Sequence, residues 1–233
     1  MNNYIALAIT FAIALGFLRL MDFFAHRGWI ESKRSRKLIH IGTGPIFVLC
    51  WFFFNDDPSA RWLAALVPLA ITIQFALIGL GVIKDKASVE AMSRTGDPRE
   101  ILRGPLYYGI MFVVLTVVYW KDSPIGIIAL MMMCGGDGIA DIFGRRIVSP
   151  KLPWSRDKSV AGMISVFVGG FILSILILYI YVNTGVFTGP ITNYLMPVTV
   201  IALAGSIIES LHYKDIDNIS MTLASALLGH WFF

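Results

Sequence analysis

Charged residues are scarce in this chain of 233 residues, where Asp, Glu, Lys and Arg together make up 15%. A soluble domain of this size carries about 25% charged and about 45–50% apolar residues. Here 57% of the residues are hydrophobic and the mean hydropathy is +0.73. This composition excludes an ordinary soluble domain and leaves no stretch for a separate one. It predicts an integral membrane protein.

Several familiar patterns are also missing. The two cysteines, Cys50 and Cys134, both lie inside apolar runs, so we expect neither a disulfide framework nor a Cys-rich metal site. There is no P-loop of the form G-x-x-x-x-G-K-S/T and no protein-kinase motif set. No internal repeat of the kind found in many secondary transporters is visible. Any nucleotide chemistry in this chain must therefore be built differently.

Apolar stretches long enough to cross the membrane dominate the sequence, because about 30 Å of hydrocarbon requires roughly 20 helical residues. The candidates are residues 4–21, 39–54, 62–83, 105–120, 124–142, 160–182, 194–211 and 219–233. The second, fourth and last are short, so we expect seven or eight crossings. The sequence therefore predicts an all-α fold: a polytopic transmembrane helix bundle that forms a single domain over residues 1–233, with no soluble domain.

The loops between these stretches alternate in charge. Four of these loops, counted together with Arg19 just before the first of them, hold every Lys and Arg of the chain except Arg61 and Lys121. These four basic loops are residues 22–38, 84–104, 143–159 and 212–218. The positive-inside rule places them in the cytoplasm and both termini outside.

The first apolar run has no basic region before it and no small-residue cleavage site after it, so it is expected to be a retained helix. We also expect no plastid or mitochondrial transit peptide, which favours either a prokaryotic source or a mature fragment. We therefore expect a multi-pass protein of a prokaryotic cell membrane, with its active face on the cytoplasmic side.

Two acids stand at the end of an apolar run, in the segment Gly135-Gly136-Asp137-Gly138-Ile139-Ala140-Asp141-Ile142-Phe143-Gly144-Arg145-Arg146. Asp137 and Asp141 are four residues apart, so in a helix they share one face, which Arg145 continues. The pattern predicts that the two carboxylates bind magnesium and that Arg145 and Arg146 contact phosphates. The alternative is an acid pair that only forms salt bridges with these arginines. Because uncompensated acids near a membrane helix end are costly, we favour the metal site.

The next loop adds cations at Lys151, Arg156 and Lys158, together with Asp157 and Ser159. Ser159 is expected to cap the helix that follows, whose free N–H groups and positive dipole end would suit a phosphate. The alternative is a solvated basic loop that reflects only topology and attraction to anionic lipids.

A third group of candidates opens the second apolar stretch at Arg36, Lys37 and His40. The two cations suit phosphate, but they are also typical of side chains that snorkel to the interface. His40 is expected to donate to a phosphate or to relay a proton, and a structural histidine is an equal alternative.

Further candidates lie near the ends of the fourth and seventh apolar stretches. Glu100 is a possible metal ligand or base, with the cation Arg103 close by. Glu209 is nearly embedded in the membrane, which predicts either a functional acid or the partner of a loop cation. Asp217 or Asn218 is expected to cap the last helix.

The chain resembles the phytol kinase branch of the polyprenol kinase family, which includes farnesol kinases and, more distantly, dolichol kinases. The resemblance is carried by RKLIHIGTG at 36–44, SRTGDPREILRGPLYYG at 93–109, GGDGIADIFGRR at 135–146, LPWSRDKSVAGMI at 152–164 and DIDNISMTLASALLG at 215–229. These stretches follow in order and cover much of the chain.

The resemblance implies an enzyme that phosphorylates a long isoprenoid alcohol, such as phytol, with CTP as donor; ATP and UTP are the alternatives. It also implies the Gly-Asp-Gly segment as the nucleotide and Mg²⁺ region. The expected partners are this alcohol, the nucleoside triphosphate and the lipid bilayer, with no nucleic acid. The sequence makes no prediction of oligomeric state.

Within this scheme we assign Asp137 and Asp141 to the metal and the surrounding cations to the phosphates. The candidate bases for the alcohol are Asp157, Glu100 and Glu209. Three other functions remain open: a CTP-dependent lipid cytidylyltransferase, a small-solute transporter and a membrane scaffold. The transporter would place its charges near the middle of the bilayer, whereas here they cluster at one end of the helices.

Overall fold

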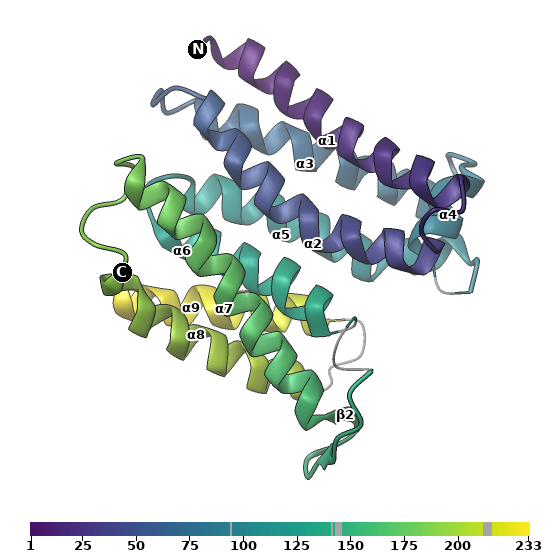
Figure 1. The fold of residues 1–233 in the computed structure, drawn as a ribbon. Helices are drawn as coiled ribbons and strands as arrows, with labels where there is room; N and C mark the ends of the chain where they lie inside the picture. Colours follow the sequence, from purple (N-terminus) through teal and green to yellow (C-terminus); the bar gives the residue numbers. More distant parts are fainter. Residues whose placement is uncertain (94, 141, 143–145, 212–215) are drawn as a thin grey trace. The chain divides into compact units, whose positions relative to one another are not determined.

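The structure of the chain is a computed structural model that describes residues 1–93, 95–140, 142, 146–211 and 216–233 (Figure 1). It divides into two compact units, Met1–Val117 and Val118–Phe233. The single domain expected from the sequence therefore stays a prediction.

Helices account for nearly all of the regular structure in the described residues. The α-helices are α1 (Asn3–His26), α2 (Ser32–Cys50), α3 (Ala60–Gly79), α4 (Lys86–Met92), α5 (Gly104–Tyr119), α6 (Pro124–Met131), α7 (Val160–Asn183), α8 (Thr192–Ser210) and α9 (Asp217–Phe232). Shorter elements are the helical turns η1 (Trp51–Phe53), η2 (Pro98–Leu102) and η3 (Met132–Asp137) and the strands β1 (Lys151–Leu152) and β2 (Ser155–Ser159). The all-α prediction is confirmed.

Each predicted apolar stretch contains a helix, but not every helix is long and apolar enough to cross a membrane. Five described segments meet both conditions: Asn3–His26, Ala60–Gly79, Pro98–Tyr119, Val160–Asn183 and Thr192–Ser210. Two apolar helices, Pro124–Asp137 and Ile219–Phe232, are shorter. The amino-terminal turns of α2 carry several Lys and Arg residues, which lower its mean hydropathy. The protein is thus a helical membrane protein, and the expected count of seven or eight spans is not confirmed.

In the first unit, α1, α2, α3 and α5 pack through polar contacts near the helix ends and aromatic contacts between them. Ser35 Oγ on α2 donates to the carbonyl oxygen of Met21 on α1 at 3.0 Å. Phe47 packs against Trp51 and Phe112, with ring centroids 5.9 and 5.7 Å apart. All three rings are buried, so they form the apolar core of this unit.

The second unit is built around η3, which packs against α7, α8 and α9 at positions occupied by glycine. A methyl group on Gly135 would lie 2.8 Å from the carbonyl oxygen of Gly169 on α7. Another on Gly205 of α8 would lie 2.9 Å from the Met132 side chain. At Gly135 the gap is too short for a real side chain, so the backbones of η3 and α7 approach as closely as small residues allow, and at Gly205 the end of the Met132 side chain takes up the space. Met132, Gly135 and Gly136 are buried as a result.

The helix predicted over residues 124–142 differs from the one observed. It is α-helical to Met131, widens into the π-helical turn η3, and stays helical at the described residues 138–140. Tertiary packing gives a physical reason, because the two adjacent glycines Gly135 and Gly136 let the wider turn lie directly against α7. Such turns are frequent at functional sites, and this one ends at Asp137.

Replacing Gly169 with alanine should destabilise the protein. The new methyl group would overlap the carbonyl oxygen of Gly135, and overpacking of this kind costs about 1–3 kcal/mol. The measurement is thermal unfolding of the detergent-solubilised protein. Gly16→Ala is the matched control, since a methyl group there meets nothing within 4 Å. Equal melting temperatures for the two variants would contradict the close-packing account.

Candidate functional site

The candidate site of the second unit begins where η3 leaves the apolar interior. Asp137 is the last residue of η3 and is half-buried, directly after the buried Gly136. Arg146 lies in an exposed turn farther along the chain. Asp141 and Arg145 lie outside the described residues, so the predicted shared face of the two acids is untested. Within the part of the chain that the structure describes, no group of three or more His, Cys, Asp or Glu side chains gathers around a common point.

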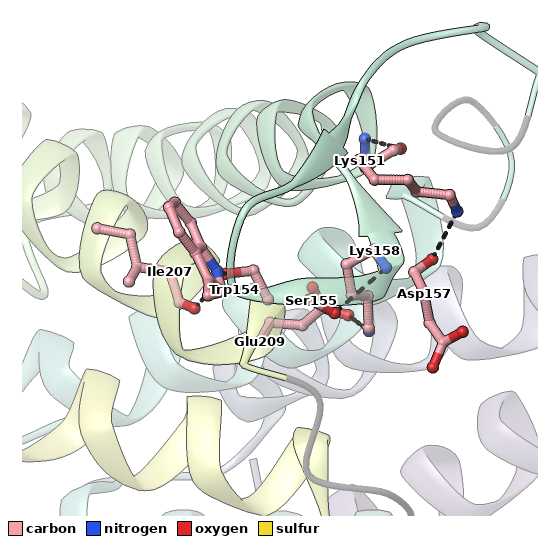
Figure 2. A network of polar contacts seen from close by, with 10 residues as sticks. Lys151, Trp154, Ser155, Asp157, Lys158, Ile207 and Glu209 are labelled. Atoms are coloured by element: carbon pink, nitrogen blue, oxygen red, sulfur yellow. Dashed lines mark hydrogen bonds and ion pairs between the residues drawn. The ribbon is translucent and has the colours of Figure 1, made fainter.

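The loop expected between residues 143 and 159 contains an antiparallel β-hairpin, which sequence reasoning missed. Lys151 pairs with Ser159 and Leu152 with Ser155, with an irregularity between the two pairs. Lys151 Nζ donates to the backbone carbonyl oxygen of Asp157 at 3.1 Å (Figure 2). This hydrogen bond links a side chain of β1 to the backbone of β2. Both Lys151 and Asp157 are exposed.

Two contacts attach this hairpin to the carboxyl end of α8. Lys158 Nζ forms an ion pair with Glu209 Oε1 (Figure 2). The indole Nε1 of Trp154 donates to Ser210 Oγ at 2.9 Å, and that hydroxyl donates in turn to the carbonyl oxygen of Ile207 at 2.6 Å. The hairpin is therefore fixed to the end of a membrane helix by one charged and one neutral contact.

The ion pair has a clear electrostatic cause. Glu209 is only 5% exposed, and a buried carboxylate is costly unless a cation accompanies it. It also lies in the last turn of α8, where the negative end of the helix dipole opposes an acid and favours a cation. The positive charge of Lys158 offsets both the cost of burying the Glu209 carboxylate and its unfavourable interaction with the helix dipole. Of the two alternatives left open for Glu209, the structure shows the partner of a loop cation.

Ser159 caps α7 as the sequence predicted. Its Oγ accepts a hydrogen bond from the N–H of Gly162 at 3.2 Å. The N–H groups of Val160 and Ala161 donate to the carbonyl oxygen of Pro150 and to Ser149 Oγ, both at 3.0 Å. Contrary to expectation, the first three N–H groups of α7 are thus bonded to the protein itself rather than open to a phosphate.

In the first unit, the start of α2 is tied to the loop that precedes α5. Arg36 Nη1 donates to the carbonyl oxygen of Ser93 at 3.1 Å, and Lys37 is buried. The His40 ring lies against the Tyr108 ring of α5, with centroids 4.5 Å apart. The Tyr108 hydroxyl donates to the His40 carbonyl oxygen at 2.8 Å. These candidates therefore have structural partners, whatever role they also have with substrate.

Glu100 organises this loop from within. Its two carboxylate oxygens accept hydrogen bonds from the Thr95 backbone N–H at 3.2 Å and from Thr95 Oγ1 at 3.1 Å. Arg103 follows η2, and its N–H donates to the Glu100 carbonyl oxygen at 3.2 Å. Nearby, hydrogen bonds from the side chain and backbone of Ser88 lower the pKa of Asp85, which caps α4.

The structure thus brings the candidates together in two groups. The first unit holds Arg36, Lys37, His40, Glu100 and Arg103, and the second holds Asp137, Arg146, Lys151, Asp157, Lys158, Ser159 and Glu209. The side chain of Arg156 lies outside the description. Sequence reasoning missed the roles of Trp154 and Ser210, and the only signal was an aromatic residue inside an otherwise polar loop.

The chain is similar to several curated plant proteins over nearly its whole length. It is 42% identical over 222 residues to a probable phytol kinase 1, chloroplastic, of Oryza sativa subsp. japonica, with 94% of this chain and 71% of the relative covered. It is 38% identical over 238 residues to the farnesol kinase, chloroplastic, of Arabidopsis thaliana, with 100% and 76% covered. The phytol kinase 1, chloroplastic, of the same plant is 39% identical over 222 residues, with 94% and 72% covered.

No protein-family model and no solved structure matches the chain. The three relatives are chloroplastic plant proteins, which conflicts with the prokaryotic cell membrane expected from the sequence. Their identity and coverage nevertheless settle the family: the chain belongs to the phytol and farnesol kinase branch of the polyprenol kinases.

Proposed function

We propose that this protein is a membrane kinase that transfers the terminal phosphate of CTP to the hydroxyl of a long-chain isoprenoid alcohol, such as phytol, giving the prenyl monophosphate. The observation that carries the proposal is the 38–42% identity, over at least 94% of the chain, to proteins named phytol kinase and farnesol kinase. The polar groups described above support it, because phosphoryl transfer requires mainly alignment and charge stabilisation.

Cations of the second unit are suited to the triphosphate. The exposed residues Arg146 and Lys151 lie in the segment between η3 and α7, and Lys158 is fixed by Glu209. A side chain that is already held in place loses less freedom when it binds phosphate, so it orients a nucleotide better than a mobile lysine. We assign the phosphate contacts to these residues, together with Arg145 and Arg156.

Mg²⁺ fits the acid segment by its donor chemistry. This ion takes one or two carboxylates and completes its shell with water and phosphate oxygens. Asp137 offers such a carboxylate at the polar end of an apolar helix, and Asp141 is the second proposed ligand. Asp137 and Asp141 would hold the ion, which would supply positive charge to stabilise the negative charge that develops during transfer.

Among the three candidate bases, Asp157 suits the alcohol hydroxyl best. Glu209 is buried and Glu100 is half-buried, whereas a base must be able to reach the hydroxyl of the substrate. Asp157 is an exposed residue on the same strand as Lys158. We therefore propose that Asp157 accepts the hydroxyl proton, on the membrane face that carries the basic loops and that the charge rule makes cytoplasmic.

The proposal predicts that purified protein in lipid nanodiscs converts phytol or farnesol and CTP into prenyl monophosphate and CDP. Chelation with EDTA should abolish the activity, and added Mg²⁺ should restore it. Mass spectrometry of the lipid and nucleotide products, with ATP and UTP tested beside CTP, makes the measurement. A lipid that carries a cytidylyl group, with release of pyrophosphate, would instead establish the cytidylyltransferase.

Asp137→Asn should lower the rate of phosphate transfer at least about 100-fold, because the carboxylate proposed to hold the metal becomes a neutral amide. Asp122→Asn is the matched control in the same unit, at an exposed residue of the short loop before α6. The readout is kcat for both variants, after confirming that they insert and unfold like the wild type. An Asp137→Asn enzyme with near-normal kcat would exclude the metal role.

Substitutions at the Lys158–Glu209 pair can separate an effect on CTP binding from an effect on the stability of the protein. Lys158→Met alone should destabilise the protein by about 3 kcal/mol, since it leaves Glu209 buried without a partner. The double variant Lys158→Met with Glu209→Gln removes that penalty and should recover the melting temperature, while the KM for CTP stays raised about tenfold or more. Recovery of the KM along with the melting temperature would show that Lys158 serves only to hold the hairpin.

A further inference from the structure

Three large apolar side chains lie exposed on the hairpin of the second unit and on the segment that leads into it. Val148 is fully exposed, at 102% of its reference area, and Ile147 and Trp154 are exposed by 55% and 53%. A single exposed apolar side chain needs no explanation. Three of them in one short and mostly polar loop indicate contact with an apolar environment.

The backbone beside Val148 is fixed to the start of α7. The hydroxyl of Ser149 accepts a hydrogen bond from the N–H of Ala161, and the carbonyl oxygen of Pro150 accepts one from the N–H of Val160, both at 3.0 Å. Both donors belong to the first turn of α7, which is long and apolar enough to cross a membrane. Val148 therefore lies next to the point where a membrane helix begins.

Trp154 is fixed in the same way to the end of α8. Its indole N–H donates to Ser210 Oγ at 2.9 Å (Figure 2). Leu203, Ile207 and Leu211 are exposed and follow one another at spacings of four residues, so they form one apolar face that runs to the end of the helix. The indole thus lies at the level where this lipid-facing surface ends. Tryptophan is enriched at that level in membrane proteins.

The lengths of the two helices place both attachment points at the edge of the hydrocarbon layer. The 24 residues of α7 rise about 36 Å and the 19 residues of α8 rise about 29 Å. The hydrocarbon layer is about 30 Å thick. Because α7 and α8 follow one another through a short loop and pack side by side, the start of α7 and the end of α8 face the same side of the membrane. The hairpin is therefore attached at the depth of the lipid headgroups.

We propose that Ile147, Val148 and Trp154 insert into the headgroup layer of the surrounding bilayer and hold the hairpin on the membrane surface. The partner is this lipid interface, which accepts apolar side chains that alternate with cations. Arg146 and Lys151 flank the inserted pair, so insertion keeps them at the depth of the hydroxyl group of a membrane-dissolved alcohol. This consequence for the alcohol rests on the proposed function, whereas the insertion itself does not.

Depth-dependent fluorescence quenching tests the insertion without relying on activity. Val148→Cys supplies one accessible thiol among the described residues, since Cys50 and Cys134 are buried. A fluorophore on this thiol, in lipid nanodiscs, should be quenched more strongly by lipids spin-labelled near the headgroup than by lipids labelled deep in the chain, and only weakly by aqueous iodide. Glu90→Cys is the control, because Glu90 is an exposed acid on α4, and its label should be quenched mainly by iodide.

Equal quenching of the two labels by iodide, with no quenching of the Val148 label by spin-labelled lipids, would overturn the inference. Quenching of the Val148 label mainly by the deep spin label would also overturn it, because the segment would then lie inside the hydrocarbon rather than at its surface.

Val148→Asp tests the consequence for catalysis. A carboxylate opposes insertion, so the rate of phosphate transfer to phytol in nanodiscs should fall roughly tenfold, because a small displacement of positioned groups is costly. The KM for CTP should not change, since the contacts of the hairpin with α8 remain. Val148→Leu is the matched control and should keep the wild-type rate. Neither variant should shift the melting temperature, because Val148 is fully exposed.

A Val148→Asp enzyme that is as fast as the wild type would show that lipid contact does not position the hairpin. A wild-type protein that phosphorylates no alcohol would instead count against the proposed function, and the quenching of the Val148 label would still decide whether the segment inserts.

Discussion

The ion pair between Lys158 and Glu209 organises the polar end of the second unit. A carboxylate that is 5% exposed in the last turn of a membrane helix is stable only beside a cation, and the hairpin supplies that cation. Trp154 and Ser210 add a neutral contact, so the hairpin stays at the end of α8. These contacts hold the hairpin, and with it Lys151 and Asp157, at the end of α8.

A second constraint is the hydrocarbon solvent, which satisfies no backbone polar group and attracts helices to one another only weakly. In the second unit, the helices are held together instead by close backbone packing, which the glycines at the contact between η3 and α7 permit. In the first unit, larger side chains fill the interior, among them the buried rings of Phe47, Trp51 and Phe112.

The long helices could be predicted because each contains a run of apolar residues, and the Ser159 cap because a serine directly precedes such a run. The short helix α4 was missed, because it lies in the polar stretch 84–104 that was predicted to be a loop. Other features depend on contacts between distant residues. The turn η3 requires the glycine of another helix, and Trp154 meets Ser210 across 56 positions of the chain. The cap predicted at Asp217 or Asn218 was wrong: α9 begins at Asp217, and its N-cap position is Ile216.

In the proposed reaction, the terminal phosphate of the nucleotide becomes the phosphate of the prenyl product. The decisive measurement supplies CTP labelled either in its terminal or in its innermost phosphate and extracts the lipid after one turnover. Only the terminal label should reach the lipid fraction. Appearance of the innermost label in the lipid would contradict it.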